Sequence, residues 1–182
     1  MVKALHSIAF LLVALFTFSF ITDDPGKKAF EDFAGNVYAS VKQNDFDKFY
    51  SYCLTKEELR EFLVKSEVDK KIIHQKLCEY DTFSTKQIFV DEFKKLQDCP
   101  KSEGAIWQET ELVNYVTKIR ADGRKGEVRI VTAARNKQFV LMCVNCHLTT
   151  NGWKLSNTPF FVSVKETEMQ NTKFIMENES QR

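Results

Sequence analysis

One short string in this sequence has the residue types and spacing of a cofactor site. Cys143-Val144-Asn145-Cys146-His147 is a literal C-x-x-C-H, the spacing at which two thiols attach to haem and the next histidine ligates its iron. The flanking residues are typical of a strand, in which residues three apart point to opposite faces. The sequence therefore predicts two separate strand cysteines, with Cys146 in the core, and c-type haem attachment is kept as an alternative.

Other chemistry at the same string fits less well. A thioredoxin-type pair needs its thiolate at a helix N-terminus, and no helix is expected to begin here. Structural zinc takes four ligands, whereas this string offers two thiols and one imidazole. We therefore predict no metal site and no resident cofactor.

The remaining thiols are Cys53, Cys78 and Cys99, which makes the cysteine count odd. In an oxidising compartment an odd count leaves at least one thiol without a partner in its own chain. Cys78 and Cys99 flank an expected helix, and a disulfide between them would close a loop of about twenty residues, worth about 3 kcal/mol in the chain-entropy model. Buried, unpaired thiols are the equal alternative.

Acid–base catalysis would need a histidine or carboxylate held in a pocket with a shifted pKa. His74 falls on an expected helix and His147 on the more polar face of an expected strand. The carboxylates fall on expected solvated helix faces, and helix capping accounts for Glu58. No catalytic residue is predicted, and a lyase or isomerase using His147 or an inward carboxylate is the alternative to a binding protein.

Aromatic residues are numerous, with sixteen phenylalanines among 182 residues. Most of those in the N-terminal half recur at helical core spacing, which favours a packed core. If the helices and the sheet splay apart, the same side chains would line an apolar ligand pocket. The pocket candidates are Phe30, Phe33, Phe62, Phe89, Phe93 and Trp153.

The N-terminal half is expected to be helical, because apolar residues recur at spacings of three and four. Thr55 and Glu58 have the spacing of a capping box at a helix start, and Ser84 is the expected cap of the last helix. Pro100 and Gly104 mark the end of this half. The expected helices begin at Lys28, after Thr55, near Val68 and after Ser84, and their apolar residues extend to Val41, Leu63, Leu77 and Leu96. A short segment over 45–50 lies between the first two.

After Gly104 the apolar period changes to two, which predicts strands over 112–119, 127–133, 139–149 and 153–164, the last one bent near Pro159. Short turns join them into an antiparallel meander, and helices followed by a meander predict an α+β fold, with N-terminal helices packed on one face of a curved antiparallel sheet. The residues expected to face the helices are Val128, Ile130 and Thr132 on the second strand, and Val140, Met142, Val144, Cys146 and Leu148 on the third.

Composition and the N-terminus indicate an exported single-domain protein. Residues 1–22 contain Lys3 and a fourteen-residue apolar run, which spans roughly 21 Å and is shorter than a membrane core of roughly 30 Å. This favours a cleaved signal peptide over a membrane anchor. The 26 basic and 25 acidic residues give a net charge of +1, which argues against a nucleic-acid partner. Residues 28–164 form the expected domain, and 165–182 a polar, mobile tail.

Three segments together carry a resemblance. Gln43-Asn44-Asp45-Phe46-Asp47-Lys48-Phe49, Leu54-Thr55-Lys56-Glu57-Glu58-Leu59 and Asn151-Gly152-Trp153-Lys154-Leu155 follow one another in an order that resembles small secreted Bacteroidetes-type proteins of the cystatin-like, or nuclear-transport-factor-2-like, α+β cone. The resemblance implies this fold and export to the periplasm or outside, but no activity, because the cone hosts enzymes and binding modules alike. We expect a non-enzymatic module for a small apolar ligand or a protein partner.

Overall fold

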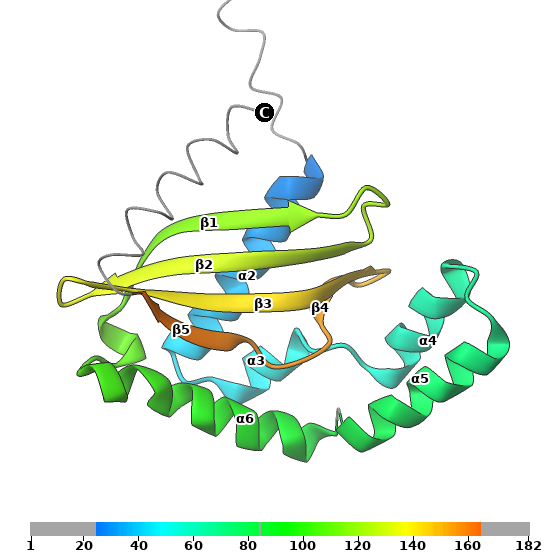
Figure 1. The fold of residues 1–182 in the computed structure, drawn as a ribbon, viewed down its shortest axis with the longest axis horizontal. Helices are drawn as coiled ribbons and strands as arrows, with labels where there is room; N and C mark the ends of the chain where they lie inside the picture. Colours follow the sequence, from blue (N-terminus) through cyan, green and yellow to red (C-terminus); the bar gives the residue numbers. More distant parts are fainter. Residues whose placement is uncertain (1–24, 84, 165–182) are drawn as a thin grey trace, which may run out of the picture.

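The computed structural model describes residues 25–83 and 85–164. The expected signal peptide and C-terminal tail lie outside the described residues. Helices come first and an antiparallel sheet follows (Figure 1), so the fold is α+β as predicted. The elements are α2 (Pro25–Lys42), α3 (Phe46–Ser51), α4 (Lys56–Lys65), α5 (Lys70–Phe83), α6 (Lys86–Asp98), the 3₁₀ turns η1 (Cys99–Glu103) and η2 (Trp107–Glu109), and strands β1 (Glu111–Ile119), β2 (Lys125–Ala134), β3 (Lys137–Thr149), β4 (Gly152–Leu155) and β5 (Phe160–Val164).

Helix starts follow the local sequence chemistry. At α4 the Thr55 hydroxyl accepts a hydrogen bond from the backbone N–H of Glu58, and the Glu58 carboxylate accepts one from the N–H of Thr55. The predicted capping box is therefore confirmed. Helix α6 begins one residue later than expected, because its cap is Thr85; the expected cap, Ser84, lies outside the described residues.

The sheet has the strand order β1-β2-β3-β4, with every pairing antiparallel. The predicted last strand is two strands, which both pair with β3. Strand β4 pairs with residues 146–149 of β3, and β5 pairs with residues 138–142. Since β2 occupies one edge of β3, the two short strands share the other edge. The stretch around Pro159 carries the chain from one to the other.

A β-bulge in β3 changes which side chains reach the core. Gly126 pairs with Cys146 and Val128 pairs with Cys143, so β3 has one more residue than β2 between these two pairs. Asn145 lies in this extra step, with a φ of 53°. The added residue reverses the alternation of side chains. Cys143 and Cys146 consequently share the core-facing side.

The predicted face of β3 is wrong before the bulge. Phe139, Leu141 and Cys143 are completely buried, whereas Val140 and its alternating neighbours on the opposite face are partly exposed. The prediction assumes that side chains alternate along the whole of β3, whereas the bulge at Asn145 interrupts this alternation. The placement of Cys146 in the core is confirmed, as are the inward positions of the second strand. The residues whose predicted face is reversed are Val140, Met142 and Val144.

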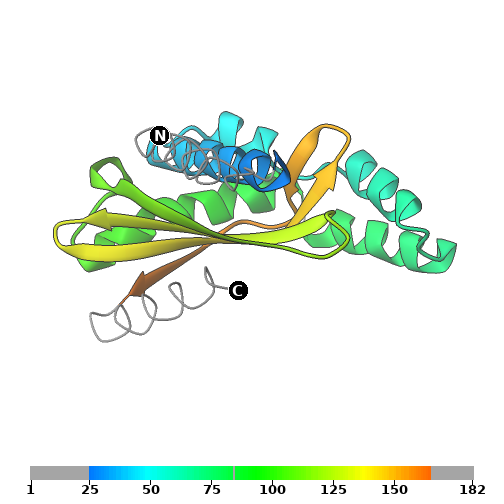
Figure 2. The same cartoon turned by 90° about the horizontal axis from the view of Figure 1, so that it is seen from above.

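Helix α2 crosses one face of the sheet (Figure 2), and α3 and α6 lie next to each other beyond the β5 edge (Figure 1). Their apolar residues form a dense aromatic core, in which the Phe30 ring centroid lies 4.2 Å from that of Trp153 and Phe49 lies 4.9 Å from Phe93. A Cβ added at Gly126 would come within 2.8 Å of the Phe30 ring. Glycine at this position therefore lets the helix approach the sheet closely.

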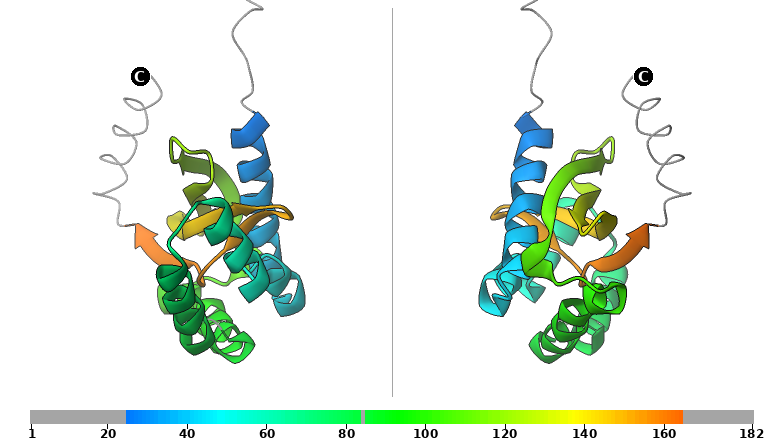
Figure 3. Two further views of the ribbon diagram at one scale, coloured as in Figure 1. Left: turned by 90° about the vertical axis from the view of Figure 1, so that its right-hand side faces the viewer. Right: turned by 90° about the vertical axis from the view of Figure 1, so that its left-hand side faces the viewer.

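Helices α4 and α5 extend past the end of the sheet (Figures 1 and 3). The β3–β4 hairpin lies between α2 and α4. Trp153 packs on Phe30 of α2, whereas His147 and Lys154, on the opposite face, contact Phe62 and Glu58 of α4. None of the described helices is both long and apolar enough to cross a membrane.

Candidate functional site

A cavity of about 510 Å³ lies between α4, α5 and the adjacent end of the sheet. Its volume falls in the range that holds small-molecule ligands. Its wall is mostly apolar, with a few polar side chains from α5 and from strands β2 and β3. The lining residues are Leu54, Leu59, Phe62, Leu63, Val68, Ile72, Lys76, Glu79, Tyr80, Lys125, Asn145, His147 and Ser156.

Helix α4 supplies the apolar wall because Leu59, Phe62 and Leu63 are three and four residues apart and share one helix face. Helix α5 closes the opposite side. The Tyr80 hydroxyl donates a 2.7 Å hydrogen bond to the Leu54 carbonyl, and burial raises the pKa of Tyr80 to about 12. This bond ties α5 to the segment that leads into α4.

His147 forms the sheet side of the wall. Its ring meets the Phe62 ring edge-on with the centroids 4.6 Å apart, and its Nδ1 atom is buried with no hydrogen-bond partner in the described structure. Burial lowers the pKa of His147 to about 4, helped by the charges of Lys125 and Arg120. The imidazole is therefore neutral at pH 7, and it has an unmet capacity for a hydrogen bond.

Lys125 is the other polar group at this wall. It pairs with His147 across β2 and β3, and its ammonium lies 5.5 Å from the centroid of the Phe62 ring. Among the described residues no carboxylate lies within ion-pair distance of Lys125. Unlike Lys125, the charged residues of α5 at this wall are paired, because Lys76 and Glu79 form an ion pair with each other at 2.6 Å.

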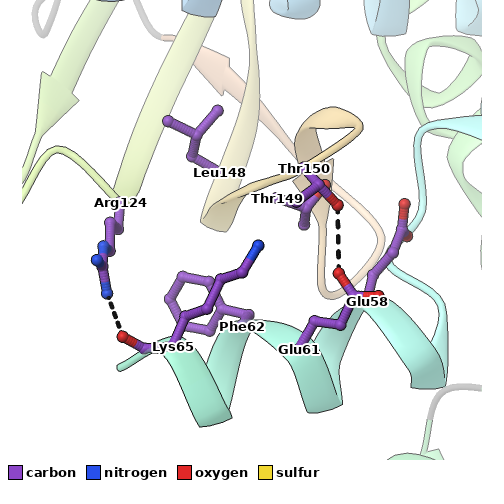
Figure 4. A pocket seen from close by; sticks show the side chains of 8 residues that line it. All are labelled: Glu58, Glu61, Phe62, Lys65, Arg124, Leu148, Thr149 and Thr150. Atoms are coloured by element: carbon purple, nitrogen blue, oxygen red, sulfur yellow. Dashed lines mark hydrogen bonds between the residues drawn. The ribbon is translucent and has the colours of Figure 1, made fainter. Parts of the chain in front are cut away.

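A second, smaller hollow of about 220 Å³ lies on the other side of Phe62 (Figure 4). Apart from the exposed Lys65 ammonium, its polar side chains already have hydrogen-bond partners. Thr150 donates to Glu61 at 3.2 Å, and the Arg124 guanidinium donates to the Lys65 carbonyl at 2.8 Å. Glu58 accepts from Asn151 at 2.9 Å. These contacts hold α4 against the β3–β4 hairpin. They leave fewer polar groups free to bind a ligand than the larger cavity does.

Of the six predicted pocket residues, the larger cavity contains only Phe62. The other five are at most 6% exposed and pack in the aromatic core, so their placement in a pocket is corrected. The physical reason is that α2 packs directly against the sheet and the α6 rings pack against those of α3, so no gap is left at these residues. Core filling and pocket lining produce the same helical spacing. The five are Phe30, Phe33, Phe89, Phe93 and Trp153.

The C-x-x-C-H thiols are in the core. Both are completely buried, burial raises the pKa of Cys146 to about 12, and it raises the pKa of Cys143 well above the usual range. Thioether attachment would require both sulfurs to border a haem-sized space, whereas they are surrounded by core side chains. His147 points to the opposite face. This geometry argues against covalent haem at these thiols.

The five cysteines are all free thiols in the structure. Cys78 lies on α5 with its sulfur 3.8 Å from His74, and the Cys99 thiol donates to the Lys95 carbonyl in the preceding turn. The disulfide considered between Cys78 and Cys99 is therefore absent. Within residues 25–83 and 85–164, no group of three or more His, Cys, Asp or Glu side chains is placed to hold a metal ion.

The chemistry of the cavity fits binding better than proton transfer. A histidine with a pKa of about 4 is a weak base at neutral pH. Glu79, the carboxylate that lines the cavity, is held by hydrogen bonds from Lys76 and Gln75, which lower its pKa. A neutral imidazole in an apolar wall can still orient a ligand by one hydrogen bond.

Comparisons with protein-family models, with curated proteins and with solved structures find no match to this chain. The class that the fold defines is therefore an α+β protein with a cavity at one end of its sheet. The resemblance to the cystatin-like cone stays a prediction.

Proposed function

We propose that this chain is an exported binding module, periplasmic or extracellular, that takes a small ligand with an apolar body into the cavity between α4, α5 and the sheet. Export is supported by the short apolar run and its flanking residues at the N-terminus. Binding is supported by the cavity itself, whose volume and apolar wall suit a small molecule.

The observation that carries the proposal is the buried Nδ1 atom of His147. A buried polar atom without a partner costs about 1–3 kcal/mol. Because Nδ1 itself has almost no exposed surface, a ligand recovers that cost by bonding to it only after the His147 ring turns toward the cavity. The apolar body of the ligand replaces water along Leu59, Leu63 and Val68. The two effects act together, so an amphipathic molecule suits the cavity better than a purely apolar one.

A direct fluorescence titration of the protein with the probe N-phenyl-1-naphthylamine tests the proposal. The probe should bind the mature protein saturably, with one site per chain. Leu59→Trp places an indole in the cavity and should weaken binding at least tenfold. Val64→Trp is the matched control, because Val64 is on the same helix, 58% exposed and not part of the cavity wall.

Two outcomes contradict the proposal. One is the absence of saturable binding to the folded protein. The other is an equal loss of affinity in the Leu59 and Val64 variants, which would place the probe elsewhere. Native mass spectrometry of the protein recovered from its own compartment supplies an independent test of export, because it reports both the cleavage position and any retained ligand.

A further inference from the structure

We infer that the ligand of this cavity is an amphipathic anion, with its charged headgroup at Lys125 beside His147 and its apolar chain along α4. This inference rests on the proposed function and adds the chemical class of the ligand. It depends on the charges and contacts at one part of the cavity wall.

The first step is the charge balance of the wall. Lys76 and Glu79 neutralise each other, since they form an ion pair. Lys125 remains, and no carboxylate within the described parts of the chain lies at ion-pair distance from it. Arg120 adds positive charge near the same place, because it acts with Lys125 on His147. The wall therefore carries an excess of positive charge, which attracts an anion.

The second step is the position of the two polar groups. Lys125 and His147 are partners across neighbouring strands, and both lie against the Phe62 ring. The ammonium is a donor, and a neutral imidazole with its proton on Nδ1 is a donor too. A single carboxylate accepts several hydrogen bonds, so one headgroup at Lys125 can also satisfy His147 once its ring turns the buried Nδ1 toward the cavity. A charge-assisted bond to Lys125 would be the stronger of the two.

The third step is what the wall offers to other headgroups. A cationic headgroup would be repelled by Lys125 and Arg120. Tyr80 cannot donate a hydrogen bond to a headgroup, because its hydroxyl hydrogen is already donated to the Leu54 carbonyl. A neutral headgroup would leave the Lys125 ammonium without a counter-ion. The apolar part of the wall, from Leu59 and Leu63 to Val68 and Ile72, then accommodates a hydrocarbon chain.

Calorimetric titration with decanoate and with decanol separates charge from apolar burial, because the two ligands share the same chain length. We expect the wild-type protein to bind decanoate about tenfold more tightly than decanol. Lys125→Met keeps the apolar stem and removes the charge, so it should weaken decanoate binding about tenfold without weakening decanol binding. Lys125→Arg should keep most of the preference.

Lys65→Met is the matched control, because Lys65 is an exposed lysine of α4 that borders the smaller hollow. It should change neither affinity. Equal binding of decanoate and decanol by the wild type overturns the anion inference and leaves the binding function intact. An equal effect of Lys125→Met on the affinities for both ligands also overturns the anion inference and leaves the binding function intact. Failure of both ligands to bind overturns the proposed function itself.

Discussion

The two ends of this molecule are built from similar helices but are packed differently. Beneath α2 the aromatic side chains fill the space to the sheet, and Phe30, Val37 and Val41 are completely buried. Where α4 and α5 run past the sheet, Ile72 remains 47% exposed and a cavity of about 510 Å³ is left. The difference teaches that tight packing is confined to one end, since α4 and α5 contact only the end of the sheet and leave their apolar faces partly free.

Thiol labelling gives the largest contrast between the two ends. Cys78 is exposed on α5, whereas Cys143 and Cys146 are completely buried in the core. Core thiols react only when the domain opens, which costs most of its global stability. With a stability of about 5 kcal/mol or more, we expect the core thiols to react more than about 10³-fold slower than Cys78. Mass spectrometry of maleimide-labelled peptides measures the rates.

Similar labelling rates for all three thiols would contradict the comparison. The raised pKa values of the two core thiols slow their reaction further. The labelling is therefore repeated at several denaturant concentrations, because only a rate limited by opening follows the denaturant dependence of unfolding.

Truncation of one large apolar side chain at each end gives the next largest effect. Phe30→Ala removes a completely buried ring that packs on Trp153 and over Gly126, and the loss should be about 3–5 kcal/mol of unfolding free energy. The matched change is Ile72→Ala, whose side chain is half exposed, with an expected loss of about 1 kcal/mol or less. Urea unfolding followed by circular dichroism measures both. Equal losses would show that the two ends are packed alike.

The cavity end should also impose a pH dependence on stability. His147 is neutral in the folded protein down to a pKa of about 4, whereas it titrates near 6.5 when unfolded. Because the unfolded chain takes up the proton first, stability falls as pH drops from about 7 to 4, by about 3 kcal/mol. His147→Asn should flatten this part of the profile, and His74→Asn, at the exposed histidine of α5, is the control.

Glu58 contributes to the pH dependence of stability at a lower pH than His147 does. Burial acts to raise its pKa, but hydrogen bonds from Thr55 and Asn151 and the charge of Lys154 outweigh burial and lower it. Its contribution is therefore present above the ordinary pKa of 4.5 and is lost as pH falls below it. A loss of stability confined to pH below 4.5 in the wild type would contradict the assignment to His147.

Much of the fold could be predicted from the sequence, because it rests on local patterns. The period of three and four placed the helices, the spacing of Thr55 and Glu58 placed a helix start, and the period of two placed the strands. The face of β3 could not be predicted, because Asn145 adopts a left-handed conformation that interrupts the alternation. Asparagine tolerates that conformation, but its presence alone does not indicate a bulge.

The site was less accessible to sequence reasoning. Apolar spacing shows which face of a helix avoids water, but it does not show whether a neighbouring element fills that face. Phe62 and Phe93 both have apolar neighbours at helical spacing, yet Phe62 borders the cavity and Phe93 is in the core. His147 was recognised as a residue on the more polar strand face. Its pairing with Lys125 depends on strand register, which the bulge shifts.

The capping threonines of α4 and α6 give the smallest contrast. At α4 both bonds of the box are present, at 3.2 Å and 3.0 Å, whereas the Thr85 hydroxyl accepts a single bond of 3.5 Å at α6. Thr55→Ala should therefore cost about 1 kcal/mol and Thr85→Ala less. Because α4 belongs to the loosely packed end, Thr55→Ala should speed amide exchange in α4 and α5 more than in α2. A uniform increase across all helices would mean that the two ends open together, and the contrast in packing would not extend to local stability.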